Sequence, residues 1–301
     1  MSARAGFVVS VAIAVGLGAV PALPQARPPA SHAGLVRQLR ELSRSVGGTV
    51  GLAAIHVESG RTVEVNGQRP LPLYSVFKLP LAVAILKDVE EGRLKLDQKV
   101  HVKAAEIVPG SAENAALWPG ATDRTLRELI ELSIARSDNT SSDKLLELAG
   151  GPGALTRRLA ALGITGITVR KSVREFLAAR GQPHPNTGSA LDLARLLARL
   201  QKGEILRADS RELLLGFMAA VTTGPNRLRG GLPQGTPVAD KTGSGPGGSA
   251  TNDVGIVTLP DAKGHVAIAV LVTGSKRPLA AQEKVIADVA RAVYEANLQA
   301  P

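Results

Sequence analysis

Strand patterns at both ends of this chain enclose a long helical region, and this order limits the folds the chain can adopt. The strand patterns lie at residues 49–58, 62–66, 238–243, 253–259 and 266–273. Between them, residues 100 to about 202 carry apolar side chains mostly at helical spacing. This order predicts one sheet assembled from both chain ends, with an all-helical subdomain inserted at about 95–205. We expect an α/β fold of the α+β type, whose antiparallel sheet is flanked by helices.

The first 26 residues have the composition of a secretory signal. Arg4 precedes an apolar run from Gly6 to Val20, and cleavage is expected after Ala22 or Ala26. The run is shorter than the roughly 18–20 residues that span a bilayer, so no retained membrane segment is expected. Residues 27–301 are therefore predicted to form one exported domain, periplasmic or secreted, and we expect it to be a monomer.

Composition excludes several classes of function. The chain has no cysteine, which removes disulfides, thiolate metal sites and a cysteine nucleophile. A formal charge of +10 is compatible with nucleic acid, but only 2% of residues are aromatic and an exported protein seldom meets nucleic acid. A positive field also steers small anions, including carboxylates, into a cleft. We therefore expect a small anionic substrate, no nucleic acid and no cofactor.

Three short strings, far apart in the chain, carry the chemistry. They are Ser75-Val76-Phe77-Lys78, Ser137-Asp138-Asn139 and Lys241-Thr242-Gly243. Ser75 at the start of a helix places Lys78 on the same helical face, where the amine can accept the hydroxyl proton. Taken alone, the first string also fits an N-cap serine followed by a surface lysine, and the second fits a capping turn. Together they supply a nucleophile, two lysines and two further hydroxyl groups, which indicates an acyl-transfer site.

In this order, the strings resemble the signature of class A serine β-lactamases and related penicillin-binding proteins. The resemblance extends over nearly all of residues 27–301 and implies a serine hydrolase that opens β-lactams through an acyl-enzyme, with antibiotic resistance as the outcome. It implies that Ser75 attacks the carbonyl, Lys78 takes the proton, Ser137 protonates the leaving nitrogen and Asn139 binds the substrate amide. The backbone N–H groups of Ser75 and Ser244 would form the oxyanion hole.

The same resemblance implies a binding site for the substrate carboxylate. Lys241 and Thr242 would bind it, and Gly243 would let the substrate backbone approach closely. Arg227 precedes Lys241 by the spacing at which some class A enzymes carry a second carboxylate-binding arginine. Arg229 is the alternative, and a solvated surface arginine remains open for Arg227.

One segment departs from the family pattern, in which a glutamate activates the deacylating water and an asparagine follows four residues later. Counted from Arg170 without gaps, Glu175 takes the glutamate position and Ala179 stands at the asparagine position. Val173 and Asn186 replace the arginine and aspartate that usually staple this loop. In a second register, Val173 takes the glutamate position and Glu175 is a surface residue. We expect Glu175 to be the general base and leave the second register open.

Two rival functions follow from this departure. A D,D-peptidase acting on peptidoglycan stem peptides has the same fold and needs no deacylating glutamate, and a β-lactam sensor would stay acylated. The five histidines are scattered without a pair at helix-face spacing, so a zinc site is not expected. We expect His184 to be a surface residue and Trp118 to be a core or loop-anchoring aromatic.

Overall fold

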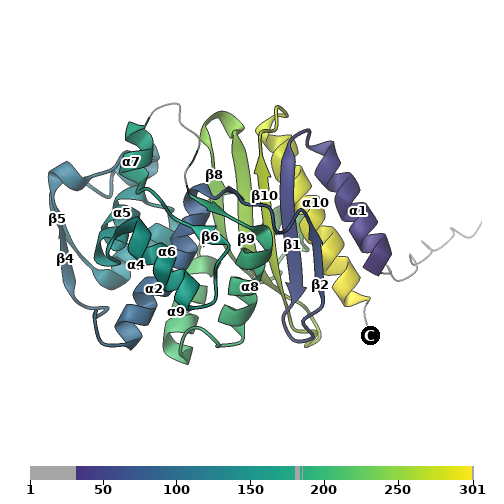
Figure 1. Ribbon diagram of the computed structural model, residues 1–301, viewed down its shortest axis with the longest axis horizontal. Helices are drawn as coiled ribbons and strands as arrows, with labels where there is room; N and C mark the ends of the chain where they lie inside the picture. The colour runs from purple at the N-terminus through teal and green to yellow at the C-terminus, as the bar shows by residue number, and fades with distance from the viewer. Residues whose placement is uncertain (1–31, 180–183, 185, 300–301) are drawn as a thin grey trace, which may run out of the picture.

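The computed structural model describes residues 32–179, 184 and 186–299, and the signal sequence expected at 1–26 lies outside them. A five-stranded antiparallel sheet lies between two layers of helices (Figure 1). In spatial order its strands are β2 (Thr62–Val65), β1 (Thr49–His56), β10 (His265–Thr273), β9 (Ala250–Thr258) and β8 (Val238–Ser244). The sheet therefore combines both chain ends, and the predicted fold class is confirmed.

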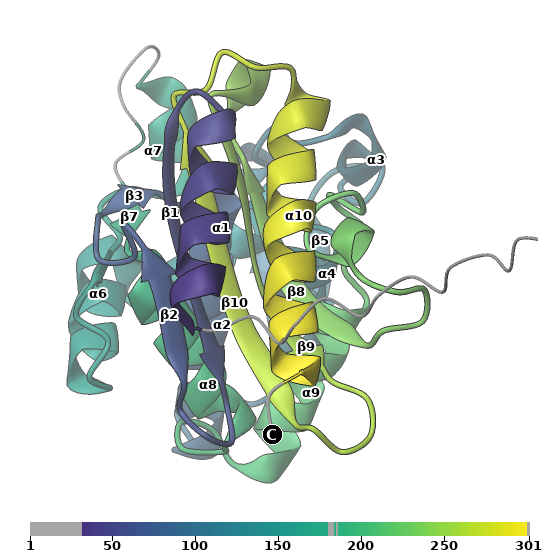
Figure 2. The ribbon, with the colours of Figure 1, turned by 90° about the vertical axis from the view of Figure 1, so that its right-hand side faces the viewer.

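Both faces of the sheet are buried, which explains why β1 and β10 read as almost continuous apolar runs. Side chains of β10 alternate between two cores. Ala267, Ala269 and Leu271 face one core, and Val266, Ile268, Val270 and Val272 face the other. The second core lies under α1 (His32–Ser45) and α10 (Leu279–Leu298), which run side by side on that face (Figure 2).

The other face is covered by helices from the middle of the chain. They are α2 (Lys78–Glu90), α4 (Leu126–Ala135), α5 (Asn139–Leu148), α6 (Gly151–Ala161), α8 (Ala190–Gln201) and α9 (Ala208–Ala219). Helix α2 is apolar and buried almost all round, because the other helices enclose it. The sequence does not predict helix α9, since this helix buries only Leu214, Phe217 and Met218 and has no clear apolar face.

Short strands and helices complete the fold, and several of these strands lie within about 95–205, so the inserted region is not entirely helical. They are β3 (Leu71–Pro72), β6 (Ile167–Thr168) and β7 (Thr187–Gly188) in one small sheet, β4 (Lys99–Val102) and β5 (Thr122–Thr125) in a ribbon, and the helices α3 (Ala112–Ala115) and α7 (Val173–Ala178). Among the described helices, none has the length and apolar character to cross a bilayer.

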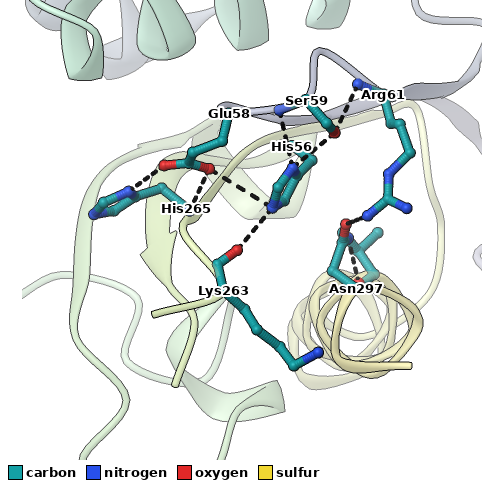
Figure 3. A network of polar contacts seen from close by, with 8 residues as sticks. His56, Glu58, Ser59, Arg61, Lys263, His265 and Asn297 are labelled. Carbon is teal, nitrogen blue, oxygen red and sulfur yellow. Dashed lines mark hydrogen bonds and ion pairs between the residues drawn. The ribbon is translucent and has the colours of Figure 1, made fainter. Parts of the chain in front are cut away.

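A polar network joins two turns at one end of the sheet (Figure 3). His265 donates to Glu58 through its backbone N–H, at 2.8 Å, and its Nδ1 lies 2.8 Å from the same carboxylate. His56 Nε2 lies 2.8 Å from the Lys263 carbonyl oxygen. Burial raises the pKa of Glu58, but the contacts with His265 outweigh this effect and hold that pKa below its usual value. Strand pairing places this network at the end of the sheet opposite Ser244.

Candidate active site

The turn that carries Ser75 is held from two sides. Ser75 lies in a 3-10 turn, Tyr74–Phe77, so α2 begins three residues later than predicted. The preceding Leu73 donates its N–H to the Asn186 carbonyl at 3.0 Å and accepts from Asn252 Nδ2 at 3.1 Å. Tyr74 has a φ of 48°, a left-handed conformation that costs a non-glycine residue about 1–3 kcal/mol. The fold around the turn maintains this strain and leaves Ser75 partly exposed.

His184 packs against the same turn, so the expected surface position is wrong. Its ring centroid lies 4.2 Å from that of Tyr74 and 4.4 Å from that of Phe176 on α7. Burial lowers the pKa of His184 to about 4, against the hydrogen bond that it makes with the Asn186 carbonyl. The imidazole is therefore neutral at pH 7 and acts here as an aromatic contact between the turn and α7.

Gly243 allows β8 to pack directly against the turn of Ser75. A Cβ atom at position 243 would lie 2.5 Å from the Leu73 carbonyl oxygen and 3.1 Å from the Val76 nitrogen. Any side chain here would push the nucleophile's turn away from the sheet. Close packing within the protein thus requires this glycine, in addition to the approach of substrate that the family resemblance implies.

Lys78 is fully buried, and it projects from the first turn of α2 into a cluster of acceptors. Its Nζ donates to the Ser137 carbonyl at 2.5 Å, to Asn139 Oδ1 at 2.9 Å and to the Asp138 carbonyl at 3.2 Å. Burial lowers the pKa of Lys78 to about 8, against the attraction of Asp138 and Asp143. About a tenth of the molecules therefore carry a neutral Lys78 at pH 7, so this amine can act as a base.

The Ser137-Asp138-Asn139 string forms the turn that leads into α5. Asp138 is the N-cap, and its carboxylate accepts from the Ser141 N–H at 2.7 Å and from Trp118 Nε1 at 3.2 Å. The capping turn and the buried position of Trp118 are thus confirmed. Ser137 has a φ of 54°, and this second left-handed residue aims its hydroxyl between the two lysines.

Lys241 reaches the same serine from the sheet. It is fully buried on β8, and its Nζ donates to Ser137 Oγ at 3.0 Å and to the Thr242 carbonyl at 2.9 Å. Burial lowers the pKa of Lys241 well below its usual value, and the nearby charge of Lys78 lowers it further. Ser137 Oγ accepts from Lys241 and lies 3.5 Å from Lys78 Nζ, so its own proton is available for donation elsewhere.

Arg227 is brought to the end of β8. Its side chain is only 4% exposed, and it donates to Ser244 Oγ at 2.8 Å and to the Asn252 carbonyl at 3.0 Å. Its Nε pairs with Glu283 at 3.1 Å. The alternative interpretation of Arg227 as a solvated surface residue is therefore wrong, and Arg227 lies beside the expected carboxylate site. Thr242, also buried, contacts Thr223 through its hydroxyl at 2.5 Å.

Arg229, the alternative, instead supports a buried pair of acids. It donates to Asp240 on β8 at 2.5 Å. Asp253 on β9 accepts from the Leu228 N–H at 3.1 Å, and burial raises the pKa of both carboxyls, that of Asp253 further because Asp240 is adjacent. Within the described residues, the buried Asp240 Oδ2 and Asp253 Oδ1 find no partner outside this pair of carboxyl groups. A proton on Asp253 shared with Asp240 satisfies both.

The structure does not bring Glu175 into the cluster. Glu175 is exposed in the first turn of α7, where its carboxylate accepts from the Ser172 N–H at 2.7 Å in a capping box. The carboxylates whose charge acts on Lys78 are those of Asp138 and Asp143. Asp143 also accepts from the N–H of Val173 at 2.7 Å. This geometry argues against the expected role of Glu175 and favours the second register, with Val173 at the glutamate position.

Three polar residues position the site, and sequence reasoning missed two of them, Asp143 and Asn252, while it named Asn186 only as the replacement of the stapling aspartate. Asp143 joins α5 to α7, Asn252 joins β9 to the turn before Ser75, and Asn186 closes the loop that begins near Arg170. Asn186 is 1% exposed and accepts from the N–H groups of Arg170 and Lys171 at 2.9 and 3.1 Å. A polar residue in an apolar strand could have indicated Asn252. Asp143 carries no such signal, whereas the place of Asn186 at the stapling position is the signal for its role.

The chain matches one known protein family over most of its length. The model of the β-lactamase enzyme family matches residues 34–297. The chain belongs to this family. It is 34% identical over 257 residues to the extended-spectrum β-lactamase PER-1 of Pseudomonas aeruginosa, with 83% of each chain covered. It is 29% identical over 267 residues to β-lactamase VEB-1 of the same organism, with 86% and 89% covered.

Solved structures of β-lactamases agree with this family assignment. A β-lactamase from Chitinophaga pinensis superposes with a TM-score of 0.83 at 36% identity, over 87% of this chain and 98% of the other. An ancestral class A β-lactamase gives a TM-score of 0.79 at 35% identity, over 87% and 99%. The chain is thus a serine hydrolase of the class A β-lactamase type. In residues 32–179, 184 and 186–299, no group of three or more acidic or histidine side chains is arranged to hold a metal ion.

Proposed function

We propose that this enzyme hydrolyses β-lactams, with Ser75 as the nucleophile. The observation that carries the proposal is the convergence of two buried lysines on one hydroxyl, because Lys78 and Lys241 both lie within 3.5 Å of Ser137 Oγ. Two buried ammonium groups so close together repel each other, so at least one amine is easily deprotonated. Such an amine beside Ser75 is a base suited to acylation.

The steps follow from the positions of these groups. Neutral Lys78 takes the Ser75 proton as the oxygen attacks the lactam carbonyl, while the backbone N–H groups of Ser75 and Ser244 hold the oxyanion. Ser137 gives its proton to the lactam nitrogen when the ring opens and is reprotonated from the lysines. Water then releases the acid, and Lys78 is the base that the geometry favours for this step too.

The substrate end is proposed from the charges beside β8. Lys241, Thr242 and Arg227 would hold the carboxylate of a β-lactam, with Asn139 bound to its amide. Asn139 Nδ2 now donates to the Pro109 carbonyl at 2.7 Å, so substrate would replace or extend that contact. Resistance to β-lactam antibiotics is the biological role that this chemistry supports.

We also propose that the protein acts outside the cytoplasm, as a monomer. The signal-like composition of residues 1–26 supports export, and the three strings all lie in one chain, so the site needs no second copy. A D,D-peptidase and a sensor remain distinguishable by experiment, although PER-1, VEB-1 and the Chitinophaga pinensis protein are all named β-lactamases.

The test combines turnover with adduct detection. A chromogenic cephalosporin should be hydrolysed in a sustained steady state, whereas a stoichiometric burst would indicate a peptidase or a sensor. Intact-mass measurement after penicillin treatment should show an adduct on the wild type and none on Ser75→Ala. Lys241→Ala should slow acylation strongly, because removing the partner of a desolvated carboxylate costs about 2–5 kcal/mol. An adduct on Ser75→Ala would overturn the assignment.

A further inference from the structure

A cavity of about 340 Å³ lies between the C-terminal end of α1 and the start of β1, two elements that are adjacent in Figure 2. Three arginines line it: Arg40, Arg44 and Arg69. Its other lining residues are neutral, and they are Ser43, Gly48, Thr49, Val50, Val65 and Asn66. The volume falls within the range of about 300–1,000 Å³ that small-ligand sites occupy.

The three guanidinium groups have no acidic partner in the part of the chain that the structure describes. The ion pairs of residues 32–179, 184 and 186–299 include none with Arg40, Arg44 or Arg69. Arginines elsewhere in the molecule are paired, as Arg195 on α8 is with Asp192. The cavity therefore gathers positive charge that no described carboxylate neutralises by direct contact.

This arrangement weakens the fold locally. Arg40 and Arg44 are four residues apart on α1, so their side chains lie on one helical face and repel each other. The third charge arrives from Arg69, in the turn after β2, where its N–H donates to the Asn66 carbonyl at 3.1 Å. An anion placed between the three would relieve this repulsion.

We propose that this cavity is a binding site for an anion that carries two or more phosphate groups. Arginine binds phosphate oxygens through paired N–H donors, and three guanidinium groups around one cavity can bind more than one phosphate. The hydroxyl group of Thr49 in the lining adds a neutral donor, whereas that of Ser43 already donates to the Leu39 carbonyl at 2.7 Å. The phosphate groups can belong to a soluble oligophosphate or to phospholipid headgroups.

The site is separate from the reaction centre. Val50 on β1 pairs across β10 and β9 to the level of Ser244 on β8, so the cavity and the active site share one end of the sheet. Three to four strand spacings separate them, about 14–19 Å. This exceeds the Debye length of about 8 Å at physiological salt, so a ligand in the cavity should leave hydrolysis unchanged.

The test uses tripolyphosphate as the probe, titrated calorimetrically into the wild-type protein and into Arg40→Ala/Arg44→Ala/Arg69→Ala. A control variant, Lys95→Ala/Arg157→Ala/Lys202→Ala, removes three exposed charges that do not line the cavity. We expect binding to the wild type and the control, weakening with salt, and a loss of about tenfold or more in the cavity variant. Both variants should keep wild-type hydrolysis of a chromogenic cephalosporin, which shows that they are folded.

Two further arms decide the source and the validity of the proposal. Flotation with vesicles that contain cardiolipin, whose headgroup carries two phosphates, lost in the cavity variant alone, would assign the site to headgroups. Binding of tripolyphosphate alone would assign it to soluble anions. Equal weakening in both variants would mean that net charge acts without a site, and would overturn the proposal. Absence of binding to both probes would overturn it as well.

Discussion

Replacing Glu175 by glutamine tests whether this residue of α7 is the base for deacylation. The structure places this carboxylate in a capping box with Ser172, on an exposed face. Glutamine can make the same box, because its side-chain oxygen also accepts from the N-cap N–H. We therefore expect Glu175→Gln to change the rate of deacylation by less than about threefold.

The size of the change in deacylation rate distinguishes the loss of a helix cap from the loss of a general base. Loss of an N-cap hydroxyl costs about 1 kcal/mol, which corresponds to about a fivefold change in an equilibrium. Loss of a positioned general base costs about 10²–10⁴-fold in rate. An effect on deacylation through α7 alone therefore stays at least about twentyfold below the effect of losing the base.

Time-resolved intact-mass measurement gives the deacylation rate directly, since the acyl-enzyme differs in mass from the free protein. Ser172→Ala is the matched control, because it weakens the same cap without removing a carboxylate. Both variants should release the acyl group at similar rates. A hundredfold slower release in Glu175→Gln, with near-normal release in Ser172→Ala, would restore Glu175 as the base and refute the register argued from Asp143.

Two more predictions concern buried carboxyls. Asp143→Asn removes a negative charge that raises the pKa of Lys78, so that pKa should fall below about 8. The acid limb of the pH profile of acylation should therefore move to lower pH. An unmoved profile would mean that Asp143 does not influence the base. Asp253 has a raised pKa in the folded state, so its ionisation in the unfolded chain should reduce stability by up to about 1.4 kcal/mol per pH unit above pH 4. Asp253→Asn cannot ionise and should flatten this decline in urea unfolding, whereas an identical slope in both proteins would contradict the raised pKa.

Most of the fold could be predicted from the sequence because its signals are local. Helix α4 lies within the region predicted to be helical, and the capping box of Thr125 and Glu128 marks its start. The strands of the large sheet are also recognisable, because β-branched residues fill both of its faces. The small strands β3, β6 and β7 are not, since two residues carry no period, and their pairing depends on chain segments that meet only in the folded protein.

The candidate site was predictable where residues act through their own motif, and not where they act through distant backbone. Lys78 follows Ser75 by one turn, so their proximity is a local property of the chain. The position of Glu175 depends on where α7 docks, and Asp143 fixes that docking through backbone N–H groups of a segment about thirty residues away. Spacing alone therefore left two registers open, and the contact of Asp143 with Val173 supports the second one, which the Glu175→Gln measurement tests.

The two lysines also couple substrate binding to the base. A carboxylate beside Lys241 favours its charged form, against the burial that lowers its pKa in the free site. A charged Lys241 then disfavours a second positive charge on Lys78, because both amines lie within 3.5 Å of the same Ser137 oxygen. The anionic substrate therefore draws the proton toward the sheet and leaves Lys78 free to accept the proton of Ser75. An uncharged substrate would provide no such effect, so the proposed preference of this site for anions would lie in the reaction step as well as in binding.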